Sequence, residues 1–494
     1  MTTDSRKWFA LAIICVAQFM VILDVSIVNV ALPSIQHGLH FSEQNLLWVL
    51  NAYALMFGGF LMLGGRVADK LGRRRVFITG VVVFTVASLF CGLATSTGWL
   101  VTSRAVQGLG AAILSPAALS ILTVTFAEGR ERNTAFSIWG AIAGAGGAFG
   151  VLLGGILTQE FGWQWIFYVN VPIGSAVVLA SFFILAPSLA EDEDRGFDIP
   201  GAVTLTAGLV LLVFGLVKST SWGWASANTV GTLAAAFVLI AVFLVIERRT
   251  ASALVPLSIF RNRSLSVSNA VSLALGASIF SMFYFLSLYM QEVLGYSALK
   301  TGVGYLAIAV SIIVAAGAAQ ALVARFGVRL VMTTGMALAA GGLVYFAQIS
   351  PHGTYVGTLL PGFLLAGVGL GLSFVPVTIG AMSGVVPNEA GVASGLITTT
   401  QQIGGALGVA VLSTIAVSAT TRFIGAHGHS AAGSIDALNH GFAIAFWFGA
   451  AFATIGCVVA FVGLAGARAS ATSGVPSGAV EGRLDLSTAD IAEG

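Results

Sequence analysis

Long apolar runs follow one another along almost the whole chain, and each is long enough to cross a lipid bilayer. A transmembrane helix needs about 20 apolar residues. Of the 494 residues, 57% are hydrophobic and 9% are charged, whereas a soluble chain carries roughly a quarter charged residues. The runs therefore predict an all-α polytopic membrane protein. The fourteen runs lie near residues 8–33, 46–65, 76–95, 100–125, 134–158, 165–187, 199–217, 229–247, 265–290, 301–323, 330–349, 356–380, 393–417 and 441–466.

The lysines and arginines test this number of spans, because basic residues gather in cytoplasmic loops. With fourteen spans and a cytoplasmic N-terminus, all but four of the 22 basic residues fall in cytoplasmic segments. Lys218, Lys300 and Arg422 fall outside, and Arg104 falls within the membrane. An error of one span would scramble this segregation. We therefore expect a multi-pass protein of the cytoplasmic membrane with both termini in the cytoplasm.

An internal repeat divides the chain into related halves. The loop from Asp69 to Arg74 recurs in weakened form from Ala324 to Arg329. This predicts two six-helix bundles related by a pseudo-twofold axis, a known transporter plan with the substrate site between the halves. The predicted parts are bundle 1–190, two inserted helices with their loops in 191–264, bundle 265–466, and a disordered cytoplasmic tail, rich in Ala, Ser and Gly, in 467–494.

Two ionisable residues lie clearly at membrane depth, Asp24 in the first run and Arg104 in the fourth. A charge there costs roughly 2.5–3.5 kcal/mol even on insertion scales, so each is a functional candidate. Their depths differ by about 6 Å, which an Arg side chain spans. A buried carboxylate can take up a proton near neutral pH, whereas Arg stays protonated. We expect Asp24 to carry a proton and Arg104 to be its partner. The alternatives are that Arg104 extends to the outer headgroups and that Asp24 caps a neighbouring span.

Glycines recur every four residues in the fifth run, at Gly146, Gly150 and Gly154, with Gly155 alongside. This spacing lets a facing helix approach closely. The pattern fits tight packing and a hinge equally well.

A stripe of polar residues marks the thirteenth run and predicts a cavity wall or a set of interhelical hydrogen bonds. It comprises Ser394, Thr398 and Gln402, with Gln401 beside them. Weaker cavity candidates, because aromatic residues are common near membrane interfaces, are Asn51, Tyr53, Tyr284 and Tyr289.

Several chemistries find no support in the sequence. No Lys follows a Gly, so no nucleotide-binding loop of the form GxxxxGK[ST] exists. No His lies at membrane depth, and we expect no catalytic residues. His427 and His429 fall in an outer loop predicted over 418–440, where solvent exposure is favoured over a metal site. A net charge of +2 does not indicate a nucleic-acid partner. We expect no cofactor, no metal and a monomer in the bilayer.

Four segments together resemble the major facilitator superfamily, and more narrowly its 14-helix drug:proton antiporters. Residues Gly65 to Arg75 are similar to the superfamily signature loop, and Leu23 to Pro33 to a motif of the 14-helix branch. The span-four motif is matched by Arg104, Gln107, Gly108 and Gly110, and a further branch segment by Trp163 to Gly174.

The resemblance implies a secondary active transporter that exports amphipathic drug-like or antibiotic compounds in exchange for protons, by alternating access. It implies that Asp24 and Arg104 handle the proton. It also implies that Gly65, Asp69, Gly72 and Arg73 form a gating loop whose contacts between bundles lock the outward-facing state.

Two departures from the family pattern leave alternatives open. Val151 stands where the antiporter motif of the fifth span usually has Pro, which weakens the support for antiport. Some members carry an extra carboxylate in the later helices, whereas Gln401 and Gln402 here are neutral, which argues against a preference for dications. The alternatives are an exporter of a single metabolite, such as a self-made antibiotic, a uniporter, and a receptor or scaffold that transports nothing.

Overall fold

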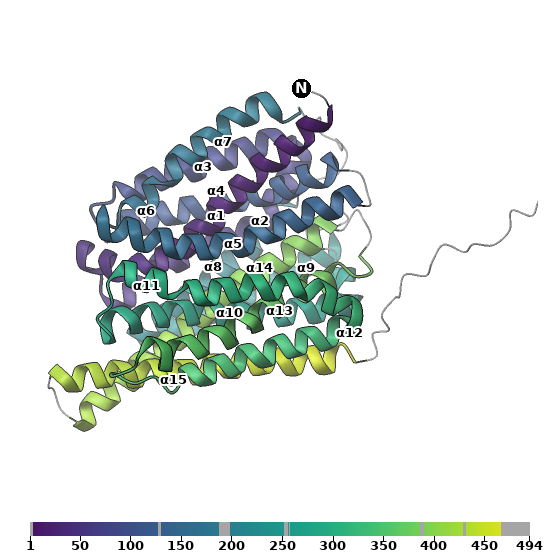
Figure 1. Ribbon diagram of the computed structural model, residues 1–494. Coiled ribbons are helices and arrows are strands. Elements are labelled where there is room, and N and C mark those ends of the chain that lie inside the picture. The colour runs from purple at the N-terminus through teal and green to yellow at the C-terminus, as the bar shows by residue number, and fades with distance from the viewer. Residues whose placement is uncertain are drawn as a thin grey trace, which may run out of the picture.

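The computed structural model describes residues 3–126, 130–186, 198–250, 255, 257–385, 390–427 and 431–465, apart from some side chains within these ranges. The described residues are almost entirely helical and contain no strand (Figure 1). A helical fold is expected in a lipid bilayer, because a helix satisfies its backbone hydrogen bonds internally. The all-α membrane fold predicted from the sequence is confirmed.

The helices pack in three groups. The first comprises α1 (Thr3–Leu39), α2 (Glu43–Leu71), α3 (Arg73–Gly92), α4 (Thr97–Thr125), α5 (Arg130–Glu160), α6 (Trp165–Tyr168) and α7 (Asn170–Ile184). The second is the pair α8 (Ile199–Trp222) and α9 (Ala227–Arg249). The third comprises α10 (Arg263–Leu288), α11 (Ala298–Gly304), α12 (Leu306–Phe346), α13 (Leu360–Met382), α14 (Ala390–His427) and α15 (Ala431–Gly463). Short segments η1 (Leu257–Arg261), η2 (Tyr289–Val293) and η3 (Tyr355–Leu359) complete the described elements.

Small polar residues set where many of these helices begin. Ser42 Oγ accepts a hydrogen bond from the Asn45 amide at 3.3 Å, and Ser96 Oγ accepts one from the Trp99 amide at 3.3 Å. Such caps satisfy backbone donors that have no partner within the helix. The same role is played at α8, α9, α10 and α11 by Asp198, Ser226, Asn262 and Ser297.

The first group (purple to blue) and the third (green to yellow) form two bundles that lie side by side in Figure 1. The bundles meet where α2 packs on α14 and where α5 packs on α11 and α12. The helix α8 bridges the first of these seams, since it contacts both α2 and α14. Thr206 Oγ1 on α8 donates to the Gly59 carbonyl of α2 at 2.8 Å, which fixes α8 to the first bundle.

Eleven helices in the described part of the chain are long and apolar enough to cross a membrane, by length and composition. One of them, Ala298–Phe346, includes two helices of α12 that are joined at Gly327. The helix α2 contributes a shorter apolar stretch, Asn45–Leu61. The total of fourteen spans therefore stays a prediction.

The internal repeat corresponds to two similar turns. Gly72, between α2 and α3, has φ 93°, and Gly327, within α12, has φ 81°. Glycine adopts this backbone conformation without the strain that a side chain would bring. Arg74, two residues after the first turn, donates through Nη2 to the Phe182 carbonyl at 2.6 Å. Arg329 occupies the same place after the second turn.

Each bundle fastens the end of its last helix with two arginines. Arg329 Nε donates to the Phe461 carbonyl at 2.9 Å, as Arg74 does to α7 in the first bundle. The first helix of each bundle supplies the other arginine: Arg6 Nε donates to the Ile184 carbonyl at 2.9 Å, and Arg263 Nη2 donates to the Val462 carbonyl at 3.3 Å. The last carbonyls of a helix lack partners within it, and they favour a cation. We call these four contacts the arginine clamps.

The prediction of a loop over 418–440 is wrong for the described residues, which are helical. The helix α14 continues to His427, and α15 begins at Ala431. The sequence there is rich in Ala and contains no Pro, so it sustains helix beyond the apolar run. The tail 467–494, the acidic run 191–194 and the residue His429 lie outside the described residues.

Candidate functional site

Asp24 and Arg104 contact each other inside the first bundle. Asp24 lies on α1 and is fully buried, and Arg104 lies on α4 and is 1% exposed. Arg104 Nη1 donates to Asp24 Oδ2 at 2.5 Å. Because Arg104 is buried, it does not extend to the headgroups, which was the alternative to pairing. The contact leaves two opposite charges paired within the helical bundle.

Three neutral side chains complete the surroundings of the Asp24 carboxylate. Gln107 Nε2 on α4 donates to Asp24 Oδ1 at 2.8 Å, and Asn170 Nδ2 on α7 donates to the same oxygen at 3.2 Å. Both amides also donate to Ser88 Oγ on α3, at 3.1 and 3.0 Å. Ser88 Oγ in turn donates to the Phe167 carbonyl at 3.0 Å. Four helices thus contribute polar groups to one buried network.

Further contacts hold the Arg104 guanidinium in place. Its Nε donates to the Val49 carbonyl of α2 at 3.0 Å, and its Nη1 also donates to Gln107 Oε1 at 2.7 Å. The Tyr53 ring lies 4.4 Å from Arg104 Cζ and the Phe167 ring lies 5.7 Å from it. Aromatic faces attract a cation at these distances. The guanidinium therefore lies between the Asp24 network on one side and Tyr53 on the other.

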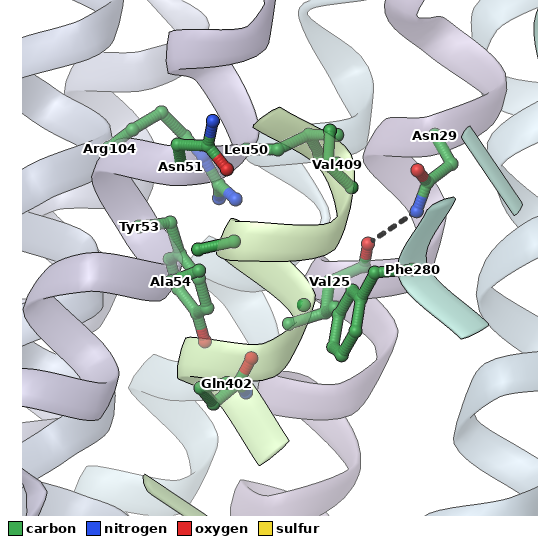
Figure 2. Close-up of a pocket in the computed structure, with 12 residues that line it drawn as sticks. Val25, Asn29, Leu50, Asn51, Tyr53, Ala54, Arg104, Phe280, Gln402 and Val409 are labelled. Carbon is green, nitrogen blue, oxygen red and sulfur yellow. Dashed lines mark hydrogen bonds between the residues drawn. The ribbon is translucent and has the colours of Figure 1, made fainter. Parts of the chain in front are cut away.

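A small cavity of about 20 Å³ lies next to Arg104, between the two bundles. Its volume corresponds to about one water molecule. Figure 2 shows Asn51 and Arg104 at one end of this cavity and Tyr53 and Gln402 reaching towards the other. The first bundle contributes Val25, Asn29, Leu50, Asn51, Tyr53, Ala54 and Arg104, and the second contributes Phe280, Gln402, Gly405, Ala406 and Val409.

The structure brings only some of the predicted cavity residues together. Asn51, Tyr53 and Gln402 line the cavity, whereas the remaining described candidates do not. Tyr289 Oη donates to the Ser350 carbonyl at 2.7 Å, a contact within the second bundle. Tyr284 packs on the Phe285 ring, with centroids 5.0 Å apart. Thr398 and Gln401 lie elsewhere on α14, and the Ser394 side chain lies outside the described residues.

The glycine stripe of α5 packs against α1, the helix that carries Asp24. A Cβ at Gly146 would lie 2.9 Å from Ile22 Cγ2, and a Cβ at Gly154 would lie 2.8 Å from the Ile27 carbonyl oxygen. A Cβ at Gly150 would overlap Ser26 Oγ and come within 2.9 Å of the Leu23 carbonyl oxygen. Only a glycine fits at this distance from a neighbouring backbone, so the stripe is a packing surface.

A matched pair of substitutions tests this packing surface. We expect Gly150→Ala to displace α5 from α1 and to lower the melting temperature of the purified protein by several degrees, because core overpacking costs about 1–3 kcal/mol. Gly147→Ala is the control, because a Cβ at Gly147 meets no atom of the described residues within 4 Å. The measurement is thermal unfolding in detergent. Equal melting temperatures for the two variants would contradict the packing assignment.

The same helix closes the seam between bundles at the end opposite Gly72, which we call the far end. A Cβ at Gly155 on α5 would lie 2.7 Å from the Ala298 carbonyl oxygen on α11. A Cβ at Gly302 on α11 would lie 2.8 Å from the Val151 carbonyl oxygen. Gln291 Nε2 of η2 also donates to the Val30 carbonyl of α1 at 3.0 Å. The two bundles are therefore in close backbone contact at the far end.

The predicted gating loop is described only in part. Gly72 forms the turn, and Arg73 begins α3 and is half-buried. Gly65 is less constrained, since a Cβ there would lie 3.6 Å from Pro116 Cβ, an ordinary contact distance. The Asp69 side chain lies outside the described residues. The gating role of this loop stays a prediction.

Asn170 and Ser88 belong to the buried network, although the sequence did not single them out. Both side chains are neutral, whereas the high cost of a buried charge draws attention only to ionisable residues. Gln107 appeared only as part of a motif, although it follows Arg104 by three residues on one helix, a spacing that places two side chains on the same face. Gln107 and Asn170 could have been predicted from the sequence, because each places a side-chain amide within an apolar run.

The comparisons with known proteins agree with this architecture. The chain is 37% identical to the puromycin resistance protein of Streptomyces alboniger, over 93% of this chain and 92% of that protein. It is 41% identical to the cephamycin export protein of Amycolatopsis lactamdurans, over 83% and 85%. The crystal structure of the POT family transporter PepTSo shares the fold, with a TM-score of 0.69 at 16% identity, over 93% of this chain and 98% of that one.

The family model described as "Major Facilitator Superfamily" matches residues 14–409, which include the Asp24 network, the inserted helices and most of the second bundle. The resemblance found in the four sequence segments is thereby confirmed. The chain belongs to the major facilitator superfamily.

Proposed function

We propose that this protein exports amphipathic drug-like or antibiotic compounds across the cytoplasmic membrane in exchange for protons. One observation carries the proposal: Arg104 binds the buried Asp24 carboxylate and also lines the cavity between the bundles. A proton site and a cavity that share one residue are what coupled transport needs. The relatives named for puromycin resistance and cephamycin export support this class of substrate.

Asp24 is the proposed proton carrier. Arg104, Gln107 and Asn170 all donate hydrogen bonds to it, so both of its oxygens act as acceptors. A proton on Asp24 would need an acceptor of its own, and at least one of these contacts would have to change. Because the donors come from α4 and α7, protonation would loosen the hold of α1 on two other helices.

The closed far end supports alternating access. The contacts of Gly155 and Gly302 seal the seam between α5 and α11 at that end. Transport requires these contacts to open in another state, while the seam closes at the Gly72 end. The distribution of basic residues supports placing the Gly72 end, with both termini, in the cytoplasm. The present arrangement is then closed to the outside.

The proposal assigns the driving force to the proton gradient, without a cofactor or metal, and treats the monomer as the transporting unit. The cavity wall favours hydrophobic contact as the basis of selection, because apolar residues make up most of it.

Export from everted membrane vesicles tests this function. We expect puromycin to accumulate when a proton gradient is imposed, and an ionophore that collapses the gradient to abolish accumulation. Vesicles without the protein give the background. Accumulation that persists after collapse of the gradient would contradict proton antiport and favour the uniporter.

A dedicated exporter of one antibiotic is the second candidate, favoured by the 41% identity to a protein named for cephamycin export. A compound panel separates the two. Movement of a single chemical class would support the dedicated exporter, and movement of unrelated amphipathic compounds would support broad export.

A further inference from the structure

Two polar groups that line the cavity have no hydrogen-bond partner among the described residues. They are Asn51 Nδ2 and Tyr53 Oη, both on α2, and their side chains are 1% and 2% exposed. A buried polar group without a partner costs about 1–3 kcal/mol. Most buried polar groups are therefore paired. Two such groups on one wall of a cavity indicate that something else binds there.

The cavity surroundings restrict what that ligand can be. Among the described residues, the lining includes one cationic side chain, Arg104, and no acidic one. The nearest carboxylate, Asp24, lies behind Arg104 and is already engaged by three donors. A cationic group in the cavity would therefore meet the guanidinium first. Asn51 Nδ2 offers N–H donors, and Tyr53 Oη can donate as well. These donors match a neutral acceptor oxygen.

The remaining walls suit an apolar ring. Phe280, Val25, Leu50 and Val409 face the cavity (Figure 2). Ala406 lines it as well. Gly405, on α14, also lines the cavity and packs closely on Phe280, since a Cβ there would lie 2.5 Å from Phe280 Cδ2. A drug-sized molecule does not fit in about 20 Å³, so it would enter only when the two bundles separate along this seam.

We infer that Asn51 and Tyr53 form a subsite for a neutral carbonyl or hydroxyl oxygen carried on an apolar ring system. This inference rests on the proposed export function and deepens it. The subsite selects neutral oxygen-bearing compounds over cations of the same shape. It also places the oxygen beside Tyr53, whose ring covers the guanidinium that holds Asp24. Substrate and proton would then act on opposite faces of Arg104.

Two dyes of nearly equal shape test the subsite. Nile red is neutral and carries a ring carbonyl, whereas Nile blue carries a cationic nitrogen group in its place. We expect purified wild-type protein in nanodiscs to bind Nile red at least fivefold more tightly than Nile blue, after subtraction of binding to protein-free nanodiscs. Tyr53→Phe removes only the hydroxyl and keeps the ring over Arg104. It is expected to weaken Nile red binding about five- to tenfold, the usual effect of one hydrogen bond, and to change Nile blue binding less than twofold.

A second variant and a matched control distinguish a loss of the subsite from a loss of folding. Asn51→Leu, which keeps the approximate shape of the side chain, is expected to weaken Nile red binding by a similar factor. The control is Tyr305→Phe, which removes another buried hydroxyl, one that donates to the Phe283 carbonyl at 2.8 Å within the second bundle. It is expected to leave both affinities unchanged.

Several results would overturn the subsite. These are tighter wild-type binding of Nile blue, an equal effect of Tyr53→Phe on both dyes, and no effect of either α2 variant on Nile red. Wild type that exports puromycin but binds neither dye overturns the subsite alone. Wild type that exports nothing overturns the proposed function, and the subsite with it.

Discussion

Replacing Asp24 with Asn is expected to abolish proton-driven export while leaving exchange of substrate across the membrane intact. Asn has nearly the shape of Asp but cannot carry the proton. Uphill accumulation of puromycin in energised vesicles should fall at least tenfold. Exchange of labelled for unlabelled puromycin at equal concentrations needs no gradient, so it should stay within a few-fold of wild type.

The Asn variant also leaves the buried Arg104 without its counter-charge, which by itself destabilises a protein by about 3–5 kcal/mol. The double variant Asp24→Asn with Arg104→Gln removes both charges and controls for this effect. Its melting temperature should lie above that of the single variant, and its uphill export should stay absent. Uphill export by either variant would contradict the assignment of the proton to Asp24. Loss of exchange in both variants would assign the pair to folding or substrate binding instead.

Replacing Gly302 with Leu is expected to hold the far end open and to stop transport. A Cβ at this position already lies 2.8 Å from the Val151 carbonyl oxygen, which is backbone and cannot turn away. The longer side chain would force α11 away from α5. We expect uphill export to fall at least tenfold, since a transporter that cannot close one end cannot complete its cycle.

Spin labels across the seam provide a direct measurement. Cysteines introduced by Glu160→Cys and Lys300→Cys, in a background without the three native cysteines, lie at exposed positions at the ends of α5 and α11. Pulsed dipolar spectroscopy should show a longer distance in the Gly302→Leu variant than in wild type. Gly317→Leu is the control, because in the described part of the chain nothing lies within 4 Å of a Cβ at Gly317. An unchanged distance distribution in Gly302→Leu would refute the closure by α5 and α11.

The sequence predicted the charged part of the site better than the neutral part. Asp24 and Arg104 stood out because a charge at membrane depth is costly and rare. Asn170 and Ser88 did not, because neutral polar residues are tolerated in spans, and their meeting depends on how four helices pack. Spacing along one helix does not determine which residues of another helix it faces.

Sequence spacing also could not show which of the cavity candidates face the seam. Tyr53 and Tyr284 both lie in apolar runs, yet Tyr53 faces the seam and Tyr284 packs into the aromatic core of the second bundle. A helix that is apolar all round carries no stripe that reveals its orientation. The repeated turn was predictable for the opposite reason. The backbone at Gly72 and Gly327 has a positive φ, which favours glycine. The glycine at the same place in both copies of the repeat is therefore visible in the sequence itself.

The arginine clamps affect how the two halves of the molecule can move. In each half, the first helix and the turn after Gly72 or Gly327 are bonded to the last turn of the final helix. In each half, the first and last helices are therefore held together at one end of the bundle. We expect these bonds to keep the end of each half together when the Asp24 contacts rearrange further along α1. The two halves are then expected to move relative to each other at the seams that α2 forms with α14 and that α5 forms with α11.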